Sequence, residues 1–230
     1  MKRAFTSRAA AEVASVRAAL ADVADPQKAP AMAAYMKDQF PFLGVQTKDR
    51  RAVQRPTVAA LGEGSVEELL AFARACWDVP ERELQYVATD ALRKHEAVLT
   101  PAHLGDLAEL ITSKSWWDTV DSLAVHTVGP LVARHRELTE EMDSWIDDDD
   151  IWLARTAILY QLSYKERTDA NRLFAYADRR AADTEFFIRK ALGWALRQYA
   201  RTDPEAVRAY VSANEDRLSG LTKREALKHL

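Results

Sequence analysis

The chain has 230 residues, of which 48% are hydrophobic and 29% charged, a composition that excludes disorder throughout. Seven glycines and eight prolines are too few for the many tight turns of a β-sandwich or barrel. No apolar run approaches the roughly 18 residues of a membrane helix. The single cysteine, Cys76, excludes an internal disulfide. The composition therefore favours a soluble helical protein.

The net charge of -3 is unevenly distributed along the chain. Residues 96–150 carry 13 acidic and 3 basic side chains, and residues 151–230 carry 10 acidic and 15 basic ones. The densest acidic stretch is residues 147–150. Such asymmetry is typical of a protein with one face that repels a polyanion and another that attracts it. The alternative is ordinary solvated surface charge.

Apolar residues recur at spacings of three and four along almost the whole chain, which predicts helices and no strands. The first helix is expected near residues 8–23. Its segment carries Glu12 and lacks the apolar centre of a signal peptide, so we interpret it as an ordinary helix. The later helices are expected near 28–40, 48–60, 66–77, 81–97, 102–111, 116–134, 137–146, 151–163, 167–180, 185–201, 204–213 and 222–230.

Capping signals support several of these boundaries. Ser65 with Glu68, and Thr222 with Glu225, have the spacing of a capping box. Asp203 precedes a proline at the first position of the next helix. The linkers are short, so we expect a single domain over residues 1–230, in which the N-terminal helix of residues 1–25 is the least supported part.

An aromatic residue followed five positions later by a small or short side chain recurs along the chain. The aromatic residues are 30, 36 and 34 positions apart. This period suits an α-solenoid, in which each helical pair buries its apolar face by stacking on its neighbours and a concave surface faces an extended partner. The pairs are Tyr86/Ala91, Trp116/Asp121, Trp152/Ala157 and Phe186/Ala191.

Asp121 departs from this repeat, because the other copies have alanine at its position. A carboxylate in a position otherwise filled by a methyl group is costly if it is buried without a partner. Trp117 precedes it by four residues and so lies on the same helical face. The pair is either an aromatic surface beside a functional acid, or a core tryptophan beside a locally paired aspartate.

Basic and aromatic residues also fall together elsewhere, in patterns suited to phosphate contacts and stacking. Arg155 follows Trp152 by three residues, and one helical stripe contains Lys190, Trp194 and Arg197. The alternative is that each tryptophan fills core and each basic residue solubilises a helix edge. A further basic cluster follows Tyr35 and the loop of residues 44–47, and consists of Lys48, Arg50, Arg51 and Arg55.

Several chemistries are excluded by the sequence. The histidines lack metal-ligand spacing such as HExxH, and there is no P-loop, nucleophile elbow or dinucleotide fingerprint. Cys76 lies within an apolar helix, which favours a buried small side chain over a nucleophile. We therefore expect no metal and no cofactor.

Several motifs over residues 28–230 resemble those of the AlkD-type DNA glycosylases, and they occur in the same order and at compatible spacing. The most characteristic is the segment Ser113-Lys114-Ser115-Trp116-Trp117-Asp118-Thr119-Val120-Asp121-Ser122. The one visible departure within a motif is Val79, where the family usually has leucine. The other motifs are Tyr35-Met36-Lys37, Phe42-Leu43-Gly44-Val45-Gln46-Thr47, Val79-Pro80-Glu81-Arg82-Glu83, Ile151-Trp152-Leu153-Ala154-Arg155, Phe186-Phe187-Ile188-Arg189-Lys190-Ala191-Leu192-Gly193-Trp194 and Lys223-Arg224-Glu225-Ala226.

The resemblance implies an all-α solenoid of HEAT-like repeats with a concave basic face that wraps duplex DNA. It implies excision of positively charged N3- and N7-alkylated purines in base-excision repair, and it suggests that the lesion's sugar and backbone are gripped while the base stays in or near the duplex. By matching positions, the active site contains Asp121, Trp117 and Trp194, and the candidate DNA contacts are Arg155, Tyr35, Gln46, Thr47 and Arg51, to which the basic stripe adds Lys190 and Arg197.

Excision of a positively charged base requires only one carboxylate. An N-alkylated purine is already positively charged, so it leaves without a general acid while oxocarbenium character develops on the deoxyribose. A carboxylate stabilises that developing cation and positions the attacking water. Asp121 is the residue that fits this role, and the faces of Trp117 and Trp194 favour cationic character.

Two other classes of function remain open. One is a non-catalytic HEAT-repeat protein that binds distorted or branched DNA, which would be expected to lack the Trp117, Asp121 and Trp194 set. The other is a protein-binding solenoid, whose basic residues would be scattered. For the glycosylase, the expected partner is double-stranded DNA with alkylated purines, and we expect a monomer without membrane contact, cytoplasmic and nucleoid-associated in a prokaryote.

Overall fold

The computed structural model describes residues 2–230, with side chains from residue 7 onward. Within that range all regular elements are helical, as the apolar spacing predicts. None of the helices described is long and apolar enough to cross a membrane. The chain divides into two compact units, Met1–Leu99 (unit 1) and Thr100–Leu230 (unit 2), and each is described by itself. The expectation of one repeat domain over residues 1–230 stays a prediction.

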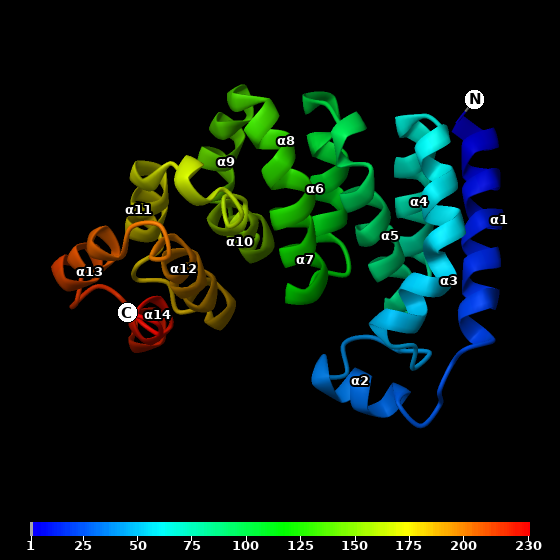
Figure 1. Ribbon diagram of the computed structural model, residues 1–230, viewed down its shortest axis with the longest axis horizontal. Coiled ribbons are helices and arrows are strands. Elements are labelled where there is room, and N and C mark those ends of the chain that lie inside the picture. Colours follow the sequence, from blue (N-terminus) through cyan, green and yellow to red (C-terminus); the bar gives the residue numbers. More distant parts are fainter. Residues whose placement is uncertain (1) are drawn as a thin grey trace. The chain divides into compact units, whose positions relative to one another are not determined.

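Unit 1 is built from helices that pack side against side. α1 packs on α3 and α4, and α5 packs on α3 and α4, as Figure 1 shows in blue to green. The contact faces are lined by side chains removed from water, among them Leu20, Phe72 and Leu84. The helices are α1 (Lys2–Ala21), α2 (Ala29–Tyr35), α3 (Thr47–Ala60), α4 (Val66–Asp78) and α5 (Arg82–Lys94).

The loop that leads into α3 is held by a buried carboxylate. Glu83, at the start of α5, accepts hydrogen bonds from the backbone N–H groups of Leu43, Gly44 and Val45 at 2.9–3.1 Å. Gly44 has a φ of 87°, and a Cβ there would lie 2.0 Å from the carbonyl oxygen of Asp25. The glycine is therefore required by both backbone conformation and packing.

Unit 2 is arranged around α10. This helix contacts α7, α9 and α12, and α12 in turn packs extensively on α14 (Figure 1). The buried side chains between them are mainly aliphatic, such as Val120, Ile158 and Leu196. The helices are α6 (Leu104–Thr112), α7 (Trp117–Leu123), α8 (Gly129–Arg134), α9 (Thr139–Trp145), α10 (Ile151–Leu159), α11 (Ala170–Arg179), α12 (Phe186–Tyr199), α13 (Pro204–Ala213) and α14 (Gly220–Ala226).

The helix predicted over residues 116–134 is continuous but not uniform. A π-helical turn, η4 (Ala124–Val128), separates α7 from α8 and contacts α10. A Cβ at Gly129 would lie 2.3 Å from the carbonyl oxygen of Tyr160. Only glycine at position 129 therefore lets this segment approach the end of α10 so closely. Such turns are frequent at functional sites, and this one begins three residues after Asp121.

Two of the three capping predictions are confirmed and one is wrong. Ser65 forms a capping box with Glu68, and Asp203 accepts from the backbone N–H of Ala206 at 2.9 Å. Thr222 does not cap the last helix, because α14 begins earlier and Ser219 accepts from the Thr222 N–H at 3.0 Å. The partner expected for Thr222, Glu225, is thereby available for other contacts.

The predicted helix over residues 28–40 is shorter in the structure. α2 ends at Tyr35, and Lys37 and Asp38 that follow have positive φ values of 58° and 56°. Left-handed residues cannot continue a right-handed helix. The chain therefore turns here and places Tyr35 at an exposed helix end.

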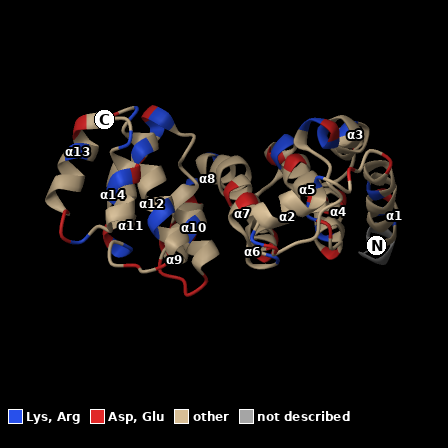
Figure 2. Ribbon diagram, turned by 90° about the horizontal axis from the view of Figure 1, so that it is seen from below, with Lys and Arg blue, Asp and Glu red and all other residues tan. Residues whose placement is uncertain are grey.

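Two acids of the segment 143–150, Asp143 and Asp147, form ion pairs within unit 2. Asp143 accepts from Arg172 and from the Tyr176 hydroxyl, and Asp147 pairs with Arg179. The loop that carries the last of these acids runs between α9 and α10 in red in Figure 2. Two of these acids are thus matched by arginines of α11.

Candidate active site

Six of the predicted functional residues meet in one pocket of unit 2. The pocket has a volume of about 340 Å³ and is bounded by side chains from α7, α10 and α12. These helices lie in contact because α10 packs on both α7 and α12. The lining residues are Trp117, Asp121, Arg155, Phe186, Phe187, Lys190, Trp194 and Arg197.

Asp121 and Arg155 form a bidentate ion pair at the base of this pocket. Arg155 Nε donates to Asp121 Oδ1 at 2.7 Å, and Arg155 Nη2 donates to Oδ2 at 2.8 Å. The third guanidinium nitrogen, Nη1, donates to the carbonyl oxygen of Phe187. Arg155 is 3% exposed. α10 and α12 therefore fix the guanidinium, and the guanidinium fixes the plane of the carboxylate.

The repeat places this carboxylate where the other copies bury a methyl group. Ala91, Ala157 and Ala191 are buried at no more than 1% exposure. The Asp121 side chain is 13% exposed and lines the pocket. The difference in sequence at this position thus corresponds to an acid that reaches a cavity.

Burial raises the pKa of the Asp121 carboxyl above its ordinary value, while the hydrogen bonds and charge of Arg155 act in the opposite direction and Asp118 raises it further. Both oxygens of Asp121 accept from N–H donors, which is the pattern of an ionised carboxylate. The group therefore combines a fixed orientation with limited hydration, as expected for a carboxylate that stabilises a cation.

An aromatic cluster adjoins the ion pair through Phe187, whose ring centroid lies 5.9 Å from the guanidinium carbon of Arg155. The rings of Trp116, Trp152 and Phe187 pack against one another with centroids 5.0–5.9 Å apart. The repeat assigned Phe186 to this aromatic position, but Phe187 occupies it and Phe186 is 57% exposed at the rim. The sequence analysis did not identify either phenylalanine as a pocket residue. The signal available was that two aromatic residues stand side by side at this point of the repeat, so that either could fill the aromatic position.

The basic stripe of α12 forms another part of the pocket wall. Lys190, Trp194 and Arg197 all line the pocket, as their spacing of four and three residues predicts. Both cations pair with Glu225 of α14: Lys190 Nζ donates to Oε1 and Arg197 Nη1 donates to Oε2. Glu225 was predicted as a helix-capping residue and was missed as part of this wall.

The remaining predicted contacts lie in unit 1. Tyr35 ends α2 and is 68% exposed, and the exposed Gln46 and Thr47 stand at the start of α3. Arg51 donates from Nε and Nη2 to Asp90 at 3.2 and 3.1 Å. Burial of Asp90 acts to raise its pKa, but hydrogen bonds from Arg51, Gln54 and Arg50 outweigh it and hold the pKa below its ordinary value. The proposed DNA contacts of these four residues stay predictions.

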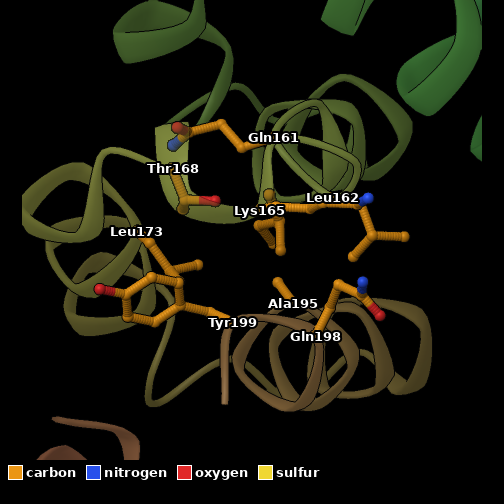
Figure 3. A pocket seen from close by; sticks show the side chains of 9 residues that line it. Gln161, Leu162, Lys165, Thr168, Leu173, Ala195, Gln198 and Tyr199 are labelled. Carbon is orange, nitrogen blue, oxygen red and sulfur yellow. The ribbon is translucent and has the colours of Figure 1, made fainter. Parts of the chain in front are cut away.

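A second cavity in unit 2 lies between α10 and α12 and is shown in Figure 3. Its volume of about 10 Å³ is roughly enough for one water molecule. Gln161 closes one side by exchanging hydrogen bonds with the backbone of Asp169. The cavity is too small for an organic ligand, and the side chains described, those of residues 7–230, include no cluster able to hold a metal ion.

Comparisons with known proteins agree with this architecture. The model of a family described as DNA alkylation repair enzyme matches residues 16–230. A solved structure described as a predicted DNA alkylation repair enzyme from Enterococcus faecalis is 33% identical, with a TM-score of 0.85 over 90% of this chain and 96% of that chain. A search of curated proteins gives no match. The all-helical fold of this chain is that of the helical-repeat proteins similar to AlkD.

Proposed function

Because the chain belongs to the DNA alkylation repair enzyme family, we propose that it is a DNA glycosylase that removes positively charged N3- and N7-alkylated purines from duplex DNA. The observation that carries this proposal is the Asp121 carboxylate, which lines a pocket between aromatic side chains and is oriented by Arg155. A pocket of about 340 Å³ is large enough for one sugar or base.

The reaction needs only the groups in this pocket and water. The C1′–N bond to the alkylated base breaks, and its electron pair neutralises the positive charge of the leaving base. The deoxyribose is left with oxocarbenium character, which the ionised Asp121 stabilises. Water adds to C1′ and loses a proton, so the products are the free base and an abasic site. Because the leaving group is a cation in the substrate, no second carboxylate is required.

The aromatic residues of the pocket also stabilise positive charge on the sugar and the base. A cation over the face of tryptophan is attracted by the ring quadrupole, and Trp117 and Trp194 both line the pocket with Asp121. Together they favour a cationic sugar and base over neutral ones. Selectivity would then follow from charge more than from the shape of the base, which suits a repair enzyme for several alkylated purines.

DNA binding is proposed to be mainly electrostatic. The candidate contacts to the sugar–phosphate backbone are Arg155, Lys190 and Arg197 at the pocket, and Tyr35, Gln46, Thr47 and Arg51 in unit 1. Phosphate contacts carry no sequence information by themselves, so binding should weaken with salt and depend little on sequence.

The direct test is incubation of the protein with methylated genomic DNA, followed by chromatography of the released bases. Release of N7-methylguanine and N3-methyladenine is the expected result. Tight binding to branched or distorted duplexes with no base released would instead support the non-catalytic alternative. An unmethylated sample of the same DNA is the control for spontaneous loss.

A further inference from the structure

The wall of the pocket formed by α12 contains an internal counter-charge. Lys190 and Arg197 line the pocket, and both bind the same carboxylate, Glu225 of α14. The Glu225 side chain is 15% exposed, so it lies largely behind the cations that it binds. Lys190 and Arg197 lie about two turns apart along α12, but their cationic head groups converge on one carboxylate.

The backbone is built to admit this carboxylate. A Cβ at Gly193 would lie 2.4 Å from Cβ of Glu225 and 2.9 Å from the carbonyl oxygen of Thr222. The Thr222 hydroxyl also donates to the carbonyl oxygen of Arg189 at 3.1 Å. The absence of a side chain at Gly193 thus lets α14 approach α12 closely enough for Glu225 to reach both cations (Figure 1).

The counter-charge sets the net charge that a substrate meets. Asp121 and Arg155 cancel each other in the pocket, and Glu225 cancels one of the charges of Lys190 and Arg197. The charged residues that line the pocket, taken together with Glu225, therefore sum to a single positive charge. Without Glu225 they would sum to two positive charges, next to a base and a sugar that the proposed reaction requires to be cationic.

We propose that Glu225 is a specificity-determining residue, which binds Lys190 and Arg197 and limits the positive charge around the pocket so that a cationic nucleotide is tolerated. This inference rests on the proposed glycosylase function. It adds a role for α14, a helix that does not line the pocket. Glu225 acts through its two partners and does not need to touch the substrate.

The test is a ratio of two affinities. One duplex carries a neutral tetrahydrofuran in place of the lesion's deoxyribose, and the other carries a cationic pyrrolidine at the same position. The dissociation constant for the neutral duplex divided by that for the cationic duplex reports the preference for positive charge, because general effects on DNA binding cancel. Glu225→Gln should lower this ratio about tenfold, the order expected for one added unit charge at partly screened distance.

The matched control is Glu225→Asp, which shortens the side chain but keeps its charge and should leave the ratio near that of the wild type. The affinity of Glu225→Gln for the neutral duplex should be unchanged or tighter, with a steeper salt dependence. The reason is that Lys190 and Arg197 no longer share a carboxylate and one of them becomes available to a phosphate. Equal weakening of both affinities, with the ratio unchanged, would show that Glu225 is only structural and would overturn the proposal.

A second variant decides the question if Glu225→Gln does not fold. Lys190→Gln removes one cation from a side chain that is 41% exposed, so it tests charge with little effect on folding. It should raise the ratio, and an unchanged ratio would refute the inference. Base release by the wild type is measured in parallel, so that a protein that releases bases but shows no shift in ratio contradicts this inference and leaves the glycosylase function intact.

Discussion

Neutralising Asp121 should destabilise unit 2 as well as affect chemistry, because its partner is buried. Asp121→Asn leaves the guanidinium of Arg155, which is 3% exposed, without its counter-charge. Breaking one partner of such a pair costs about 3–5 kcal/mol of unfolding free energy. For a chain of this size, this corresponds to a decrease in Tm of about 6–20 °C. Arg155→Gln should cost a similar amount for the converse reason.

The double variant Asp121→Asn/Arg155→Gln distinguishes pairing from packing. Its loss of stability should be smaller than the sum of the two single losses by about 2–3 kcal/mol, because no buried charge is left unpaired. Urea unfolding followed by tryptophan fluorescence is a suitable assay, since every tryptophan except Trp77 lies in unit 2. Additive losses, or wild-type stability of Asp121→Asn, would refute the coupling inferred from the bidentate geometry.

Three further predictions concern the pocket and the loop before α3. Trp117→Ala should slow excision more than it weakens binding to undamaged duplex, as measured by single-turnover rates and by titration; equal losses would indicate a packing role. Gly44→Ala should lower the unfolding free energy by about 2 kcal/mol or more, because φ is 87° and the added Cβ would meet Asp25. The control Gly105→Ala, in α6 with open space around it, should instead stabilise by about 0.5–1 kcal/mol. The excision rate should fall on acidification with a midpoint above 3.8, since burial raises the pKa of Asp121 and the carboxylate is the active form; a midpoint at or below that value in a pH–rate profile would contradict the assignment.

The helices could be predicted from sequence because nearly every one buries a stripe of apolar residues. The exceptions are places where backbone geometry overrides that pattern. α2 ends at Tyr35 because Lys37 and Asp38 adopt positive φ. The π-helical turn after α7 has the same apolar spacing as an α-helix over a few residues, so periodicity alone does not reveal it.

The candidate site could be predicted in part. The repeat singled out Asp121 by its chemistry, and helical spacing grouped Lys190 and Trp194. The pairing of Asp121 with Arg155, 34 residues later, depends on how α7 packs against α10 and cannot be read from local spacing. Glu225 was predicted as a capping residue because its spacing from Thr222 fits a capping box. Only the packing of α14 on α12 reveals that it binds the basic side chains of the pocket wall.

The central claim is that the Asp121 carboxylate stabilises the positive charge that develops on the sugar. Its most direct test is single-turnover excision of N7-methylguanine from a defined duplex by the wild type and by Asp121→Asn, below the Tm of the variant. We predict that the variant is slower by about 100-fold or more, while its affinity for a duplex with an abasic-site analogue is nearly intact. Excision by Asp121→Asn at the wild-type rate would contradict the claim.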